Sequence, residues 1–250
     1  METAGRQEAL GDFSALIDEE VWAAYRPAIE ALRERGIPFA LGGGLAFCAY
    51  SERWRRLKDV DLFILPRDRD AAVEAIGRGG FRDYFDVKPY DREWIFRGHR
   101  GEHIIDLISK MANYRNEVEE EWFRGGGEIL LYGTRLPLLP IEELVFSKLY
   151  IVQKDRCDWP DLLNIFHERA SEMRWSRVRE LVGADMALVS SLLSLFGWIC
   201  PARAREIPAP VWEAFGVREP EEDHVCDCHE RVPLLDSRDW FGPTSTESVQ

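Results

Sequence analysis

The chain has 250 residues with a formal net charge of −13, and 46% of its residues are hydrophobic and 31% charged. This is the composition of a globular protein with a substantial core, and the negative charge disfavours non-specific binding to nucleic acid or to an anionic membrane. The first residues carry neither the basic nor the apolar segment of a secretory signal. The apolar stretch 186–200 is too short to span a bilayer. These features predict a cytoplasmic protein, and five scattered cysteines do not indicate a disulfide framework.

The first half of the chain alternates helix and strand signals. Residues 18–35 repeat apolar side chains at helical spacing and are stopped by Gly36 and Pro38. Further helices are predicted at residues 45–50 and 68–77. Strands are predicted at residues 39–41, 59–65, 81–87, 93–97, 103–108, 128–131 and 134–137, separated by glycine and proline.

After Pro140 the strand signals end. Helices are predicted at residues 141–154, 159–168, 176–182 and 186–200. From residue 201 the chain is acidic and rich in proline, which is typical of an irregular, partly disordered tail. We therefore expect an α/β (α+β) domain at residues 1–138, with a mixed β-sheet core flanked by helices, then a small helical domain at residues 139–200 and a tail at residues 201–250.

The segment 38–65 carries the clearest chemical signal. Gly42, Gly43 and Gly44 follow a buried strand and precede a helix, where backbone N–H groups can meet phosphate oxygens. Asp59 and Asp61 are two apart, so in a strand both side chains leave the same face. Two like charges repel each other unless a cation lies between them, and a hard divalent cation suits carboxylates. The segment therefore predicts a site for metal-bound phosphates.

A third carboxylate, that of Asp106, lies in the apolar strand 103–108. A buried aspartate is costly unless it is paired or binds a metal. Three carboxylates on neighbouring strands can hold one or two Mg²⁺ ions against a triphosphate. A basic cluster lies between the glycines and the first acids, and within it Arg56 and Lys58 are candidates for phosphate contact, or else part of a solvated loop.

This pattern resembles the DNA polymerase β-like nucleotidyltransferase superfamily, and in particular its small bacterial members. The matching residues are the glycine pair, Asp59-Val60-Asp61 and Asp106, within residues 38–108, with a weaker likeness over residues 148–163. The resemblance implies a nucleotidyltransferase fold, an NTP as substrate and Mg²⁺ as cofactor. It implies that the glycines hold the phosphates and that Asp59 and Asp61 are metal ligands. It also implies that Asp106 is both ligand and general base, and that Lys148 contacts the nucleotide.

The implied reaction transfers a nucleoside monophosphate from the NTP to an acceptor hydroxyl and releases pyrophosphate, in a cleft between the two domains. Negative charge favours a small molecule or a protein as acceptor over long nucleic acid, and a cationic acceptor such as an aminoglycoside would suit an acidic cleft.

Two other interpretations stay open. Many catalytic members of the superfamily have serine after the first glycine, where this chain has glycine only, and the interval from Gly44 to Asp59 is long. A non-catalytic binding or regulatory module with the same fold, such as a toxin–antitoxin component, is therefore an alternative. The tail residues His224, Cys226, Cys228 and His229 could bind zinc, although their spacing is uncommon in structural zinc sites.

Overall fold

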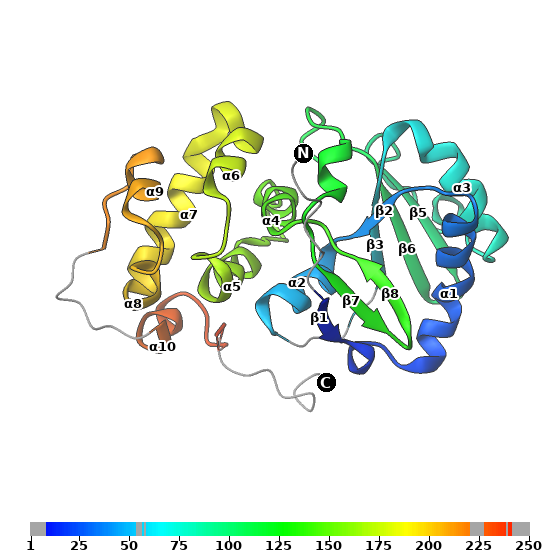
Figure 1. Cartoon of the computed structure of the whole chain (residues 1–250), viewed down its shortest axis with the longest axis horizontal. Helices are drawn as coiled ribbons and strands as arrows, with labels where there is room; N and C mark the ends of the chain where they lie inside the picture. Colours follow the sequence, from blue (N-terminus) through cyan, green and yellow to red (C-terminus); the bar gives the residue numbers. More distant parts are fainter. Residues whose placement is uncertain (1–8, 54–56, 58, 221–227, 239, 242–250) are drawn as a thin grey trace, which may run out of the picture. The chain divides into compact units, whose positions relative to one another are not determined.

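The computed structural model describes residues 9–53, 57, 59–220, 228–238 and 240–241. The described residues form two compact units. The first contains residues 9–49 and the described residues up to Pro140. The second contains Tyr50–Arg53 and the described residues from Ile141 onward. Figure 1 shows both units, with labels on most of their helices and strands.

A five-stranded sheet is the centre of the first unit. Its order is β2-β3-β6-β5-β4, and β3 and β6 are parallel whereas the other neighbours are antiparallel. The sheet is therefore mixed, and the predicted α+β architecture is confirmed. The bounds of its strands are β2 (Phe39–Leu41), β3 (Asp59–Ile64), β4 (Arg82–Asp83), β5 (Ile95–Arg100) and β6 (His103–Ile108).

A smaller sheet has the order β1-β7-β8, with β1 (Ala9–Asp12) parallel to β7 (Glu128–Leu131) and β8 (Thr134–Pro137) antiparallel to it. An isolated bridge between Leu41 and Leu138 links β2 to the chain just after β8.

Two helices, α1 (Glu19–Glu34) and α3 (Arg69–Arg78), pack on each other and on β6 (Figure 1). Gly98 of β5 faces this layer, because a Cβ built on it would lie 3.2 Å from Ile76 Cδ1 of α3. Side chains alternate along a strand, so the residues next to Gly98 and its cross-strand partner Ile105 face the opposite side of the sheet. That opposite face carries the polar residues described below.

The second unit is helical. Helix α4 (Ile141–Leu149) packs on α5 (Trp159–Arg169) and α6 (Trp175–Val182), and α5 packs on α7 (Met186–Ile199). Two glutamates at the start of α4 are buried and paired with arginines: Glu142 with Arg174, and Glu143 with Arg177 of α6. Shorter α-helices follow within the described residues: α8 (Pro201–Ala204), α9 (Ala209–Ala214) and α10 (Cys228–Arg231).

Several predicted elements differ from the structure. The expected strand 81–87 is only β4, because the Asp83 side chain accepts a hydrogen bond from Phe85 N–H and begins a 3₁₀ turn at Tyr84–Asp86. Helix α4 ends at Leu149, where a turn follows and Val152 bridges to Cys157. Strand β1 was not predicted, because its residues show no alternation and pair only with distant β7.

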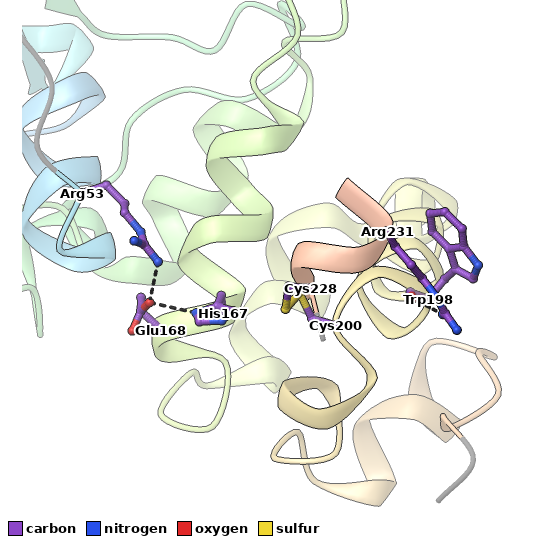
Figure 2. Close-up of a disulfide and its surroundings, with 7 residues drawn as sticks. All are labelled: Arg53, His167, Glu168, Trp198, Cys200, Cys228 and Arg231. Atoms are coloured by element: carbon purple, nitrogen blue, oxygen red, sulfur yellow. Dashed lines mark hydrogen bonds and ion pairs between the residues drawn. A yellow bond between two sulfur atoms is a disulfide. The ribbon is translucent and has the colours of Figure 1, made fainter. Parts of the chain in front are cut away.

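The cysteine prediction was wrong. Cys200, which follows α7, and Cys228 of α10 form a disulfide (Figure 2). Sequence spacing could not reveal this pair, because the two cysteines have a sequence separation of 28 residues. The described part of the expected irregular tail is helical over α8, α9 and α10, and the Cys228 end of it is covalently attached to the helical unit.

One helical stretch among the described residues, Trp175–Ile199, is long and apolar enough to cross a membrane by length and composition. Gly183, with φ of 51°, interrupts it between α6 and α7. Helices in the core of soluble proteins meet the same criterion, and Leu192 and Phe196 of α7 are fully buried in the helical unit.

Candidate active site

The three predicted acids lie on one face of the central sheet. In the parallel register of β3 and β6, Asp61 is directly opposite Asp106, and Asp59 is opposite Ile104. Residues opposite each other in a register point to the same side, and Asp59 shares the side of Asp61 by the two-residue period. This is the face opposite α1 and α3. The local reason is the strand pattern itself, in which Val60 and Leu62 are buried on the helix side.

The glycine turn is fitted around Asp61. Gly42 N–H donates to the Asp61 carbonyl oxygen at 3.0 Å, and Ala46 N–H donates to the Gly42 carbonyl oxygen as the first bond of helix α2 (Gly43–Ser51). Gly43 has φ of 51°, and a Cβ there would lie 1.6 Å from Asp61 Oδ2. A carboxylate oxygen therefore lies against the first residue of α2, where the helix dipole favours negative charge. The left-handed backbone and the close approach of Asp61 both favour glycine at position 43.

Asp106 is held by a cation that the sequence interpretation missed. Arg97 of β5 is opposite Asp106 in the antiparallel register, and its guanidinium donates from Nε to Oδ1 at 2.8 Å and from Nη2 to Oδ2 at 2.6 Å. The Asp106 side chain is 2% exposed and that of Arg97 is 35% exposed. A bidentate ion pair of this kind offsets much of the free-energy cost of burying the aspartate.

Further contacts fix the backbone of Arg97. Its N–H donates to the Tyr90 hydroxyl at 3.0 Å, and that hydroxyl donates to Asp83 Oδ1 at 3.0 Å. Asp83 is also paired with Arg92. A chain of polar contacts thus runs from the loop after β4 to the sheet face that carries the acids. The signal in the sequence was an arginine at the end of the predicted strand 93–97, which comes directly before the Asp106 strand along the chain.

The acids create a negative field that reaches two other groups. Hydrogen bonding to Asp106 holds the pKa of Arg97 well above its ordinary value, against the effect of burial, and the charges of Asp59 and Asp61 add to the increase. Burial raises the pKa of Tyr25 in α1 to about 12, and the negative charges of the same three aspartates contribute.

The donor set suits a hard divalent cation in its chemistry, because carboxylate oxygens on one sheet face are the ligands that Mg²⁺ and Mn²⁺ accept. Within the described residues, however, no three His, Cys, Asp or Glu side chains are grouped closely enough to hold a metal ion. Both Asp106 oxygens contact Arg97. A cation held by Asp59 and Asp61 would therefore meet Asp106 as a carboxylate that is already bonded to Arg97.

The remaining predicted residues have different surroundings. Arg56 and Lys58 lie outside the described residues. Lys148 belongs to the helical unit, where its ammonium is buried and donates to Asp158 at 3.0 Å and to Asp161 at 2.8 Å.

In the proposed zinc cluster, His224, Cys226 and the side chain of His229 are outside what the structure describes. The fourth member, Cys228, is bonded to Cys200, so its sulfur is not a thiolate available to a metal.

Comparisons with known proteins give structural likenesses only. No family model and no curated protein matches the chain. The solution structure of the antibiotic-resistance factor ANT(2″)-Ia has 19% identity and a TM-score of 0.48, covering 70% of this chain and 96% of its own. The lincosamide antibiotic adenylyltransferase LnuA, bound to lincomycin, has 13% identity and a TM-score of 0.42, covering 60% of this chain and 96% of its own. JHP933 from Helicobacter pylori has 14% identity and a TM-score of 0.40, and the match covers 86% of this chain and 88% of JHP933. At these identities and TM-scores, the likenesses assign neither an activity nor a substrate to the chain.

Proposed function

We propose that this protein transfers a nucleoside monophosphate from an NTP to an acceptor hydroxyl, with release of pyrophosphate. The observation that carries the proposal is the register of β3 and β6, which puts Asp59, Asp61 and Asp106 on one sheet face next to the glycine turn. Paired carboxylates beside a helix start are what a metal-bound triphosphate requires.

Each group then has a distinct role. The backbone N–H groups of Gly43 and Gly44 at the start of α2 bind phosphate oxygens. Asp59 and Asp61 hold Mg²⁺, which supplies charge neutralisation for the phosphates and the leaving pyrophosphate. Asp106 orients the acceptor hydroxyl and takes its proton. Lys148 of the helical unit remains a candidate nucleotide contact.

The acceptor is proposed to be a small molecule or a protein hydroxyl, and a cationic small molecule is preferred. The net charge of −13 favours a positively charged acceptor and disfavours long nucleic acid. Aminoglycosides are a convenient probe class, because they combine several amines with several hydroxyls.

The test measures pyrophosphate release and label transfer from each of the four NTPs, with Mg²⁺ and a panel of cationic and neutral hydroxyl compounds. We expect the Asp59→Ala/Asp61→Ala variant to lose transfer while it keeps the circular dichroism spectrum of the wild type. Asp70→Asn is the matched control, because Asp70 is an exposed carboxylate in the first turn of α3. Unchanged transfer in the Asp59/Asp61 double variant would contradict the mechanism.

A second candidate function is non-catalytic nucleotide binding, and the Arg97–Asp106 pair favours it. A guanidinium that donates to both oxygens occupies part of the lone-pair capacity with which Asp106 would accept a proton from an acceptor hydroxyl. Calorimetric titration with each NTP, with and without Mg²⁺, separates the two functions. Binding without any transfer to any acceptor supports the module, whereas turnover supports the enzyme.

A further inference from the structure

We propose that Arg97 is a positioning residue for Asp106 and competes with a divalent cation for the Asp106 carboxylate. The inference rests on the proposed function only in taking this sheet face as the cation site. Its evidence is the pairing of Arg97 Nε and Nη2 with the two Asp106 oxygens, at 2.8 Å and 2.6 Å.

The geometry of the pair gives Arg97 its positioning role. Arg97 and Asp106 are opposite each other in the β5–β6 register. The guanidinium therefore reaches the carboxylate directly, from one strand to its neighbour. A planar guanidinium that bonds both oxygens fixes the carboxylate's rotation as well as its charge. A lysine at the same place would supply the charge but only one point of contact.

Charge balance gives Arg97 its second role. Asp106 is opposite Asp61, and Asp59 is two residues away along β3, so three carboxylates share a small area of the sheet. Arg97 is the cation paired with the most buried of them. A divalent cation that approaches Asp106 must displace an Arg97 N–H from one carboxylate oxygen or share the carboxylate with Arg97. The positive charge of Arg97 also repels the cation.

The half-exposed position of Arg97 allows such an exchange. Its side chain is 35% exposed, whereas the Asp106 side chain is 2% exposed, so the cation can leave the pair more readily than the anion can. The Tyr90 hydroxyl accepts a hydrogen bond from the Arg97 backbone N–H and so holds it within the strand. The guanidinium can therefore move while the backbone stays in register.

The experiment is a Mn²⁺ titration without nucleotide, by calorimetry or by the loss of free-Mn²⁺ paramagnetic signal, on the wild type and four variants. We expect Arg97→Met to bind Mn²⁺ about tenfold more tightly or better, because one positive charge beside the carboxylates is gone. Arg97→Lys should gain less. In Arg97→Met/Asp106→Asn the gain should disappear, because the contested carboxylate is absent. This double variant also removes both members of the buried pair, which keeps the comparison possible if Arg97→Met alone folds poorly.

Arg67→Met is the matched control. Arg67 is an exposed arginine of the same unit, paired with Glu120, so its loss changes the net charge equally without touching Asp106. We expect its Mn²⁺ affinity to equal that of the wild type. A purely structural Arg97 would lower the melting temperature of Arg97→Met but would not raise its Mn²⁺ affinity. Equal or weaker Mn²⁺ binding by Arg97→Met, or an equal gain in Arg67→Met, overturns the inference.

The outcomes for the two proposals are separable. If Arg97→Met binds Mn²⁺ more tightly and no variant transfers nucleotide, the inference stands and the proposed transferase function fails. If the wild type transfers nucleotide and Mn²⁺ affinity does not depend on Arg97, the function stands and the inference fails. With transfer established, we also expect the kcat of Arg97→Met to fall about tenfold or more while the KM for NTP changes little, since Asp106 is misplaced and the phosphate contacts are intact.

Discussion

Gly43 and Asp61 fit together so closely that a side chain at position 43 would force the Asp61 carboxylate to move. A Cβ at Gly43 would lie 1.6 Å from Asp61 Oδ2, and the Gly43 backbone has φ of 51°. The first residue of helix α2 and a carboxylate of the central sheet are thus in direct contact. This relationship ties the two halves of the sequence motif, the glycines and the acids, into a single structural unit.

Replacing Gly43 by alanine should therefore damage both stability and the site. The left-handed backbone alone costs about 1–2 kcal/mol for an L-residue, and the Asp61 carboxylate must also move. We expect a lower free energy of unfolding in urea and weaker nucleotide binding. Gly77→Ala is the control, because Gly77 lies in α3 with nothing within 4 Å of a built Cβ, and there alanine should stabilise by about 0.5–1 kcal/mol. Equal stability of the two variants would contradict the assigned fit.

The disulfide between Cys200 and Cys228 should stabilise the helical unit. It closes a loop of 28 residues in sequence separation, for which chain entropy predicts about 3–4 kcal/mol. Figure 2 shows Arg231 of the same short helix α10 at Trp198, so the attachment also has a cation–π contact. We expect Cys200→Ala/Cys228→Ala, measured under oxidising conditions, to lose free energy of unfolding by about that amount.

Two observations check this disulfide prediction. Cys157→Ala should leave stability unchanged, since Cys157 is an exposed free thiol. Reductant added to the unfolding assay should lower the stability of the wild type but not that of the double variant. If reductant does not change the free energy of unfolding of the wild type, the disulfide does not contribute to stability and the prediction is contradicted.

Lys148 should prove essential to the helical unit whether or not it also contacts nucleotide. Its side chain is 6% exposed and its ammonium neutralises Asp158 and Asp161. Removing one partner of a buried ion pair costs about 3–5 kcal/mol, so Lys148→Met should be strongly destabilised in urea unfolding.

Adding Asp158→Asn to Lys148→Met should restore part of the loss, and Lys154→Met, at an exposed lysine, should have no effect. A role in nucleotide binding would show as weaker NTP binding under conditions where Lys148→Met is still folded. Stability equal to the wild type in Lys148→Met would refute the structural role.

Acid should destabilise the protein partly through Asp158. Burial alone would raise the pKa of this carboxyl, but hydrogen bonds and charges from Arg156 and Lys148 outweigh burial and lower the pKa below 3.8. A folded-state pKa below the unfolded value gives stability that is present above the unfolded pKa and is lost as pH falls through the folded pKa. The free energy of unfolding should therefore decline as pH falls below about 4. Asp158→Asn should show a shallower decline in chemical unfolding measured from pH 6 to pH 2.5.

Local sequence patterns predicted most of the framework. The alternation in residues 59–65 and 103–108 identified two strands of the sheet, and the helical spacing of residues 18–35 identified α1, because buried faces impose these periods on a chain. The two-residue interval between Asp59 and Asp61 was enough to predict a shared face. The helix–strand order predicted a mixed α+β core followed by helices.

Pairing between elements decided the rest. The register that puts Asp61 opposite Asp106 and the bond between Cys200 and Cys228 each join residues far apart along the chain. The contact of Arg97 with Asp106 depends on the pairing of the successive strands β5 and β6. Strand register is fixed by burial of a whole sheet face, and a charge finds its partner only after the strands are assembled. The sequence by itself therefore determined which residues are candidates for the chemistry. Only the tertiary structure decided that Asp106 already has a cation, because the arginine that supplies it becomes adjacent only when β5 pairs with β6.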